Sequence, residues 1–547
     1  MKRSNDADSA EQQSSKNKIR ALTLTENGPR INVRTLILGA TMFEISEEEI
    51  LGRLKFDNPW WDDEAPEHVA YSKMPRRKYF APFLRAVTDR SIQRAVVLMG
   101  PRRVGKTVMV YHAIEALLQS GVAGKDILYL SLETPLYTGL RLDKIVQMYT
   151  NLLGLTKNSQ VYIFFDEIQY LKGWEVHLKS LVDSYVDYKF VATGSAAAAL
   201  RMKSNESGAG RFSDFILPPL TFAEYLQFVK KENSLIKKEE LQPGRYHYSC
   251  NNIEELNNEF ICYLNYGGYP EAVFSDTVKS NPGQYIKSDI IDKVLLRDLP
   301  SLYGISDIQE LNRLFTVLAY NTGNEVSLEE LSKSSGVAKN TIKRYLEYLD
   351  AAFLIRRIER IDQNARRFKR AMQFKIYLTN PSMRAALFGQ VSKDAETMGN
   401  LTETAIFSQW QHSESVDLYY ARWNSGEIDI VSLSTTNQKP QWMVEVKWSD
   451  RPYEDRSLLR HCVEFAQLHP TLIRDQTLIT TKSITADIEY KGMNFKLQPS
   501  SLYAYILGSN ILSHKTNADQ ELAIAGIVED EADAEPYDTD SESDMTG

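Results

Sequence analysis

The sequence predicts an α/β protein whose amino-proximal domain is built on a parallel sheet. Short apolar runs at residues 95–99, 127–132, 161–165 and 190–193 alternate with amphipathic helical patterns. Each run is a few residues long and rich in branched and aromatic side chains, which is typical of a strand buried on both faces. Helices between successive strands are the crossovers that a parallel sheet needs. Helical patterns dominate from about residue 222, and strands and helices mix again from about residue 390.

The composition indicates a globular chain of several domains. Its 547 residues, at roughly 150 residues per domain, favour three or four domains. No stretch approaches the roughly 20 apolar residues of a membrane span, and the first twenty residues lack the apolar core of a secretory signal. We therefore expect a cytoplasmic protein that does not enter a membrane. Cys250, Cys262 and Cys462 are far apart and lack metal-site spacing, so we expect reduced thiols.

The formal net charge of −8 is unevenly distributed. Nine carboxylates and no Lys or Arg lie between residues 529 and 544, so the rest of the chain is close to neutral. Such a tail is typical of a solvated, disordered segment that is repelled by polyanions. Basic patches on the folded body therefore remain compatible with the overall negative charge.

Residues 100–107 read GPRRVGKT, which fits the pattern G-x-x-x-x-G-K-[ST]. The motif follows the apolar run AVVLM and precedes the helical pattern VMVYHAIEALLQ, which is the strand, loop and helix that a phosphate-binding loop requires. Loop amides would bind phosphate oxygens, Lys106 would reach the β and γ phosphates, and Thr107 would hold Mg²⁺. A chance match in a glycine turn is the alternative. The candidate nucleotide-binding residues are Gly100, Pro101, Arg102, Arg103, Val104, Gly105, Lys106, Thr107 and Asp166.

Polar residues also end the predicted strands at 161–165 and 190–193. Asp166 and Glu167 close the run VYIFF, where Asp166 would bind Mg²⁺ and Glu167 would orient or deprotonate the attacking water. Thr193 and Ser195 close the run VATGS and would sense the γ phosphate, unless they only cap a turn. Arg211 is a candidate arginine finger acting on a neighbouring subunit, and a solvated arginine in a glycine loop is the alternative.

Residues 327–348 predict a helix-turn-helix: a Ser-capped helix, a turn at Gly336, and the second helix KNTIKRYLEYL. The runs FLIRRIER and QFKIYL resemble the strands of a wing. DNA contact is one reading, and a docking module or a solvated loop is the other. The candidate DNA-contacting residues are Lys339, Asn340, Thr341, Lys343 and Arg344 on the helix, and Arg366, Arg367, Lys369 and Arg370 around Phe368 in the loop.

A third group of charged residues follows the wing. Asp429 ends one strand pattern, and the strand WMVEVKW places Glu445 and Lys447 two residues apart, as in the hairpin of PD-(D/E)xK nucleases. Asp429 and Glu445 would ligate Mg²⁺, Lys447 would stabilise charge, and Glu403 would be the additional acid from a helix. Two readings need no nuclease: the charges mark a solvent face, or Lys447 pairs with Glu445 or Glu427.

As a set, these motifs resemble prokaryotic AAA-type ATPases whose carboxy-terminal half is a domain of unknown function 4143. The resemblance rests on GPRRVGKT, FFDEIQYLKGWEVHLKSLVDSY, FVATGSAAAAL, GAGRFSDFILPPLTFAEYL, YLNYGGYPEAV and VLLRDLPSLYGI, and covers roughly residues 75–510. It implies a P-loop NTPase parallel sheet with a helical lid, a winged helix-turn-helix, and a restriction-endonuclease-like α/β domain. Two positions depart from it: Ala196 follows Ser195 where a serine is common, and Asn380 replaces a frequent aspartate.

These observations predict Mg²⁺-dependent ATP binding and hydrolysis, coupled to DNA binding and to DNA cleavage by a nuclease-like domain. We expect ATP and Mg²⁺ as cofactors, DNA as a partner, and a homo-oligomer if Arg211 acts in trans. One alternative is a nucleotide-dependent binding switch with an inert nuclease-like fold, and another is an ATP-driven protein-remodelling subunit. The expected segments are a disordered 1–34, an extension 35–74, an AAA-type domain 75–225, a helical lid 226–304, a winged helix-turn-helix 305–385, a nuclease-like domain 386–513 and an acidic tail 514–547.

Overall fold

The computed structural model describes residues 34–38, 41–62, 69–137, 139–194, 210–242, 245–367, 373–413, 416–469, 472 and 477–511. The chain divides into two compact units, residues 1–50 and residues 51–547. The first unit contains the antiparallel pair β1 (Arg34–Leu38) and β2 (Thr41–Ile45), and α1 (Glu47–Asp57) begins in it. Apart from Arg34, the predicted disordered segments 1–34 and 514–547 lie outside the described residues.

A five-stranded parallel sheet forms the amino-proximal part of the second unit. Its order is β4 (Ile127–Ser131), β5 (Tyr162–Asp166), β6 (Lys189–Gly194), β3 (Ala95–Met99), β7 (Phe212–Ile216). The four predicted strands are confirmed to within one or two residues, and β7 is an addition. Every neighbouring pair is parallel, which confirms the α/β class.

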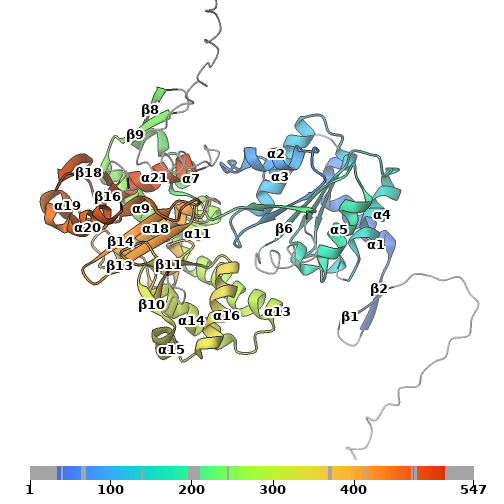
Figure 1. The fold of residues 1–547 in the computed structure, drawn as a ribbon. Coiled ribbons are helices and arrows are strands. Elements are labelled where there is room, and N and C mark those ends of the chain that lie inside the picture. Colours follow the sequence, from blue (N-terminus) through green and yellow to red (C-terminus); the bar gives the residue numbers. More distant parts are fainter. Residues whose placement is uncertain are drawn as a thin grey trace, which may run out of the picture. The chain divides into compact units, whose positions relative to one another are not determined.

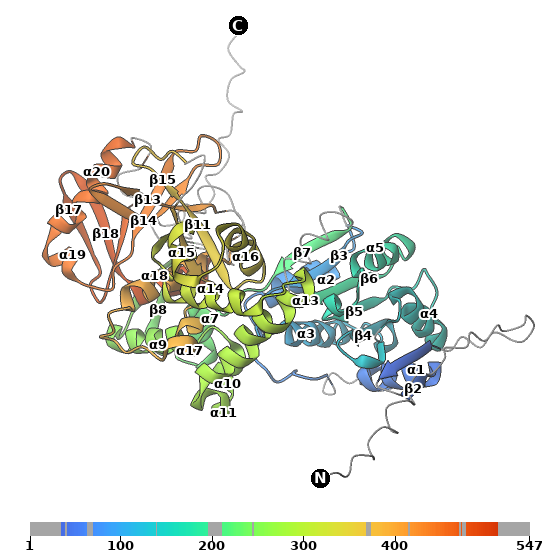
Figure 2. The ribbon, with the colours of Figure 1, turned by 90° about the horizontal axis from the view of Figure 1, so that it is seen from below.

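Helices cover both faces of this sheet (Figure 2). They are α2 (Phe80–Thr88), α3 (Lys106–Gln119), α4 (Leu142–Leu153) and α5 (Trp174–Ser184). On one face, Met109 and Ala113 of α3 share a core with Val96, Leu98 and Phe164 of the strands. Because both faces are buried, the strands are almost continuously apolar, which is why their positions were readable from the sequence.

The next segment is mainly helical, as predicted, but it also contains a hairpin. Helix α7 (Phe222–Phe228) begins with a capping box formed by Thr221 and Glu224. Strands β8 (Ile236–Gln242) and β9 (Arg245–Cys250) pair antiparallel and were not among the predicted elements. The run IKKEELQ is charged and largely exposed, so it lacks the alternation that marks a half-buried strand. The remaining helices are α8 (Glu232–Leu235), α9 (Ile253–Tyr266), α10 (Pro270–Phe274), α11 (Asp276–Ser280), α12 (Pro282–Tyr285), the π-helical stretches η6 (Ile286–Asp292) and η7 (Val294–Asp298), and α13 (Leu299–Tyr303).

The predicted pair of helices is present between residues 328 and 351. Ser327 and Glu330 form a capping box at the start of α15 (Leu328–Ser335), and Gly336 ends this helix with φ +74°, a left-handed conformation that favours glycine. The second helix is α16 (Lys339–Ala351). The flanking elements are α14 (Ile308–Tyr320), β10 (Glu325–Ser327), β11 (Ile355–Ile361) and β12 (Gln373–Leu378).

A nine-stranded sheet runs through the carboxy-terminal half (Figure 1). Its order is β10-β12-β11-β13-β14-β15-β16-β18-β17, and β11 pairs parallel with β13 at Glu359 and Tyr419. The sheet therefore continues across the domain boundary expected at residue 385. The further strands are β13 (Leu418–Trp423), β14 (Gly426–Leu433), β15 (Pro440–Glu445), β16 (Thr477–Thr481), β17 (Ala486–Tyr490) and β18 (Met493–Pro499).

Helices pack on the two faces of this sheet and separate two cores. On one face, α18 (Met398–Trp410) and α21 (Ser500–Asn510) enclose Trp442 and Val444. On the other, α20 (Arg460–Leu468) covers a core that includes Val431, Met443 and Ile479. The remaining helices are α17 (Ser382–Phe388), α19 (Arg451–Glu454) and a short 3-10 turn (Arg456–Leu459). Among the described helices, none has the length and apolar character needed to cross a bilayer.

Candidate functional site

The loop GPRRVGKT joins the end of β3 to the first residue of α3. Two of its glycines are required by the geometry. A Cβ on Gly100 would lie 2.1 Å from the carbonyl oxygen of Leu217, and Gly105 has φ +96°. Backbone that passes this close to its neighbours is accessible to glycine alone. The loop thereby brings its amides to the amino terminus of α3, which is an arrangement suited to anions.

Lys106 and Thr107 begin α3 and point into the same site. The Lys106 ammonium is buried and donates to the carbonyl oxygens of Gly100 at 3.1 Å and Pro101 at 2.8 Å. Burial lowers the pKa of Lys106, while the Glu167 and Asp166 carboxylates oppose that shift. The Thr107 hydroxyl donates to Asp166 Oδ2 at 2.8 Å, so the loop and the end of β5 meet as predicted.

Asp166 is the centre of a hydrogen-bond network. It accepts from the hydroxyl of Tyr129 at 3.0 Å and from the hydroxyl of Thr193. Burial and the adjacent Glu167 raise the pKa of Asp166, and the hydroxyl donors from Thr193, Thr107 and Tyr129 oppose that rise. Thr193 also accepts from the amide of Glu167 at 3.0 Å. Thr193 thus orients both acids, and Tyr129 is a member of the site that the sequence did not reveal.

A cavity of about 770 Å³ opens at this network. This is within the usual range of ligand pockets, about 300–1,000 Å³. Residues 102–107, Asp166 and Glu167 line one side, and residues of the helical segment line another. The apolar and aromatic part of the lining consists of Tyr71, Met74, Pro75, Val108, Met109, His112, Phe228, Pro270 and Phe274. Loop residues that suit phosphates, together with apolar and aromatic side chains, make a lining that suits a nucleotide.

The side chains of the two loop arginines pair with acids of the helical segment. Arg102 binds Asp298 through two hydrogen bonds of 2.6 and 3.0 Å, which are bidentate and charge-assisted. Arg103 lies 3.2 Å from Glu271 and 2.9 Å from Asp289. Both aspartates lie in the π-helical stretches, a conformation that is rare and frequent at functional sites. The loop is thereby tied to the helical segment through its side chains.

Arg211 does not line this cavity. Its guanidinium pairs with Asp183 of α5, and its carbonyl accepts from the amide of Ala95 at the start of β3. The phosphate-binding loop follows the opposite end of that strand, and Arg211 is not among the described residues that line the cavity. A role as an arginine finger therefore requires a second subunit and stays a prediction. Ser195 lies outside the described residues.

The four residues predicted for a nuclease-like centre lie close together. Glu403 is on α18, Asp429 is on β14, and Glu445 ends β15. Lys447 lies two residues past β15, and its Nζ is 2.7 Å from Glu445 Oε1 and 3.4 Å from Asp429 Oδ2. The amide of Val446 donates to Asp429 at 3.0 Å. The hairpin of β14 and β15 is antiparallel, as the motif predicted.

Lys375 of β12 joins this centre, and the sequence did not reveal it. Its Nζ lies 2.7 Å from Glu427, 2.8 Å from Glu403 and 3.3 Å from Asp429. Burial disfavours the charged ammonium, but Glu403, the Tyr377 hydroxyl, Asp429 and Glu427 outweigh it and raise the pKa of Lys375 well above its ordinary value. The run QFKIYL offers no local signal of this role, because its partners are contributed by α18 and β14.

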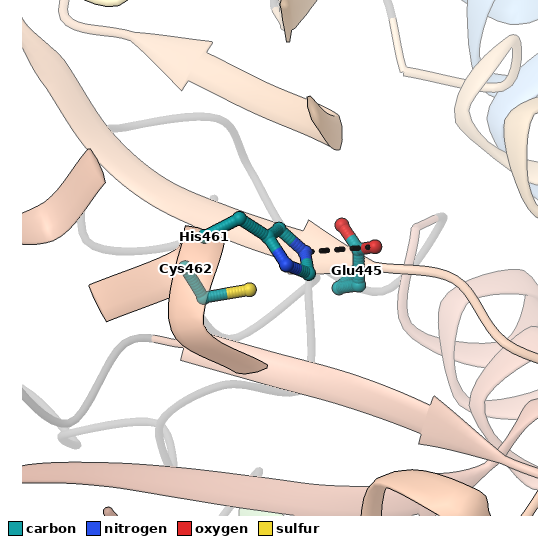
Figure 3. Close-up of side chains that lie close together, drawn as sticks. All are labelled: Glu445, His461 and Cys462. Atoms are coloured by element: carbon teal, nitrogen blue, oxygen red, sulfur yellow. Dashed lines mark ion pairs between the residues drawn. The ribbon is translucent and has the colours of Figure 1, made fainter. Parts of the chain in front are cut away.

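A histidine and a cysteine of α20 lie close to Glu445 (Figure 3). His461 Nε2 lies 3.1 Å from Glu445 Oε1. Burial lowers the pKa of His461, but the neighbouring Glu445 carboxylate more than reverses this effect, so the pKa of His461 lies above its ordinary value. Cys462 is buried beside them, and the candidate ligand atoms of the three residues lie within 4.8 Å of one another. All three cysteines are free thiols, as predicted.

The comparisons with known proteins identify the amino-proximal region. Residues 92–226 match the family model of an AAA domain. The chain contains an AAA-type P-loop domain. Residues 257–394 match a different model, a domain of unknown function (DUF8612), where the motifs predicted domain of unknown function 4143. The AAA match includes the loop at 100–107 together with Asp166, Glu167 and Thr193. The second match includes Lys375 but ends before Glu403, so the acidic centre lies mostly beyond it.

The chain is similar over 61–65% of its length to proteins of a bacterium and an archaeon. It is 26% identical to an uncharacterized protein of Haemophilus influenzae over 341 residues, covering 61% of this chain and 78% of the relative. It is 25% identical to an uncharacterized protein of Methanocaldococcus jannaschii over 372 residues, covering 65% and 76%. Among solved structures, the Aeropyrum pernix ORC2 protein in its ADP form aligns with a TM-score of 0.28 and 14% identity, covering 51% of this chain and 85% of that one.

Proposed function

We propose that the AAA domain binds ATP with Mg²⁺ at the cavity beside residues 100–107 and hydrolyses it. The observation that carries the proposal is the hydrogen bond from Thr107 to Asp166, which joins the loop to the acidic end of β5. Lys106 and Glu167 line the same cavity. These are the parts that phosphoryl transfer needs: a cradle for phosphates, a cation, a metal-ligand pair and a group that positions water.

The residues present fit a magnesium ion. A hydroxyl and a carboxylate supply the hard oxygen ligands that Mg²⁺ prefers, and Thr107 and Asp166 place them side by side. Thr107 and Asp166 would hold the ion, which would supply positive charge next to the phosphates. Lys106 holds the terminal phosphates, and Thr193 keeps Asp166 in place through its hydroxyl. Glu167 orients the attacking water and accepts its proton, and the side-chain amide of Gln169 donates to this carboxylate and steadies it.

Glu167→Gln should separate binding from hydrolysis. The amide has the same shape but cannot accept a proton from water, so we expect ATP turnover to fall by about 100-fold or more, the usual contribution of a general base. ATP affinity should stay within about twofold, because Lys106, Thr107 and Asp166 are intact. Phosphate release and the affinity for a fluorescent ATP analogue are measured in parallel. Asp143→Asn, at a surface ion pair of α4 with Arg141, is the matched control. Unchanged turnover in Glu167→Gln would remove Glu167 from the mechanism.

We further propose that residues 308–378 form a winged helix that contacts DNA. Its order of helix, strand, two helices and two strands supports this reading, with β10, β12 and β11 as antiparallel neighbours at one end of the nine-stranded sheet. Lys339, Asn340, Lys343 and Arg344 are exposed near the start of α16, the helix that would enter a major groove. Arg366 and Arg367 of the wing are also exposed, while Lys369 and Arg370 lie outside the described residues.

Reversing two charges on α16 tests the DNA proposal. In Lys343→Glu/Arg344→Glu, two phosphate contacts are lost and two repulsions are added. We therefore expect DNA affinity to fall at least about tenfold in low salt, with a shallower dependence on salt. Fluorescence anisotropy with a labelled duplex measures both quantities. Lys393→Glu/Arg451→Glu makes the same charge change at exposed positions outside residues 308–378 and should bind like the parent. Equal losses in the two double variants would indicate a non-specific effect of net charge and contradict the assignment.

A further inference from the structure

The centre around Asp429 has the carboxylates of a metal site, but its oxygens are already occupied. Glu403, Glu427 and Asp429 surround the Nζ of Lys375 at 2.7–3.3 Å. Glu445 is shared between Lys447 at 2.7 Å and His461 at 3.1 Å. Each of these four carboxylates therefore has at least one nitrogen partner within 3.3 Å.

The position of the Lys375 ammonium conflicts with a divalent cation. Mg²⁺ binds oxygens at about 2.0–2.1 Å and needs the oxygens of several ligands to converge on it. Here the oxygens of Glu403, Glu427 and Asp429 converge on a nitrogen instead. A divalent ion in the same cradle would lie within a few ångströms of a positive charge in a water-poor interior, where repulsion is strong. The residues present do not fit the metal that this type of fold implies.

Lys375 is held in this position by its surroundings. It is 3% exposed and lies on β12, which pairs with β10 and β11 on its two sides. The Tyr377 hydroxyl donates to the same Glu403 oxygen at 2.5 Å, so a second group of β12 engages that acid. Glu403, Asp429 and Glu445 are buried and need counter-charges to be stable there, and Lys375 supplies the most deeply buried one. If the Lys375 ammonium moved away to make room for a metal ion, the carboxylates would lose this counter-charge.

We infer that the Lys375 ammonium takes the place of a divalent cation in the nuclease-like centre, and that the chain does not cleave DNA by metal-dependent hydrolysis. The domain then acts as a binding module whose acidic centre is structural. This inference concerns a centre separate from the ATP site, and it stands or falls independently of ATP hydrolysis.

The test uses the full-length, nucleotide-free protein and Mn²⁺ as the probe. Four proteins are compared: the parent, Asp429→Asn, Lys375→Met and Lys375→Met/Asp429→Asn. Free Mn²⁺ is measured by electron paramagnetic resonance. The parent and Asp429→Asn should bind the same number of equivalents. Lys375→Met should gain one equivalent, and the double variant should lose it again. Any Mn²⁺ at the P-loop is common to all four and cancels in the comparison.

Thermal unfolding gives a second readout. The Tm of Lys375→Met should rise more than the Tm of the parent when Mn²⁺ is added, because only in this variant does the ion restore a missing counter-charge. If Lys375→Met does not fold, the parent and Asp429→Asn still show whether the parent centre binds Mn²⁺, because equal binding by the two proteins means that it does not. The inference is overturned if the parent binds one equivalent more than Asp429→Asn, if the parent cleaves DNA with Mn²⁺ and Asp429→Asn does not, or if folded Lys375→Met gains no metal.

Discussion

Replacing Lys106 with alanine is expected to abolish ATP turnover. The Lys106 ammonium is buried at the start of α3, beside the carbonyl oxygens of Gly100 and Pro101. No other described lysine or arginine of the loop directs its charge to the same point, because Arg102 and Arg103 are paired with acids of the helical segment. Without Lys106, charge developing on the transferred phosphoryl group loses its nearest cation. A loss of about 100- to 1,000-fold is typical of removing one such group.

Steady-state phosphate release at saturating Mg-ATP measures this effect. Lys144→Ala, at an exposed position of α4, removes the same charge from the surface and should turn over ATP at the parent rate. A Lys106→Ala protein that is folded and retains the parent rate would contradict both the site and the proposed activity.

Arg77→Met is expected to destabilise the protein by about 3–5 kcal/mol, the usual cost of leaving a buried charge without its partner. The Arg77 guanidinium binds both oxygens of Glu224 at 2.7 and 2.9 Å and donates to the carbonyl of Val104 at 2.9 Å. Glu224 is fully buried. One side chain thus ties the phosphate-binding loop to α7. Its loss leaves the loop carbonyl of Val104 without this donor and the Glu224 carboxylate without its counter-charge, although the amides of Lys78 and Thr221 still donate to that carboxylate.

The pH dependence of this deficit follows from Glu224. Burial raises the pKa of Glu224, but the Arg77 guanidinium outweighs burial, so the pKa of Glu224 lies below its ordinary value. A carboxyl with a depressed pKa adds stability above its ordinary pKa, and this contribution is lost as the pH falls through the folded value. In Arg77→Met the buried Glu224 has lost the charge that lowers its pKa, so it takes up a proton at a higher pH than in the parent. The deficit should therefore be largest at neutral pH and above, and should shrink as the pH falls, first as the carboxyl of the variant and then that of the parent becomes protonated.

Denaturant midpoints and Tm values measure the deficit. Arg53→Met breaks a partly exposed ion pair with Asp57 in α1 and should cost less than about 1 kcal/mol. Arg77→Met/Glu224→Met removes both charges and should be more stable than Arg77→Met alone. Similar costs for Arg77→Met and Arg53→Met would show that the buried pair contributes no more than a surface pair.

Local sequence was sufficient for four of the five strands of the parallel sheet and for the helix pair. The four predicted strands are apolar on both faces. In the loop GPRRVGKT, Gly100 and Gly105 supply the backbone conformations and close approach that the loop needs. The helix pair α15 and α16 could be predicted because Ser327 and Glu330 cap α15 and Gly336 ends it. Each of these signals is contained within a few consecutive residues, so no knowledge of the packing was needed. The same reasoning failed at β8 and β9, whose charged run has no buried face.

From the sequence alone we predicted the class of the fold, the phosphate-binding loop, the acids at the end of β5, and the acids that lie on β14 and β15. Only the tertiary structure decided which side chains complete each centre: Tyr129 and Thr193 on Asp166, Arg77 on Glu224 across 147 residues, and Lys375 among the carboxylates. Such contacts join elements that are distant along the chain. They depend on how strands align in a sheet and which helix covers them, and no periodicity or spacing within one segment encodes that alignment.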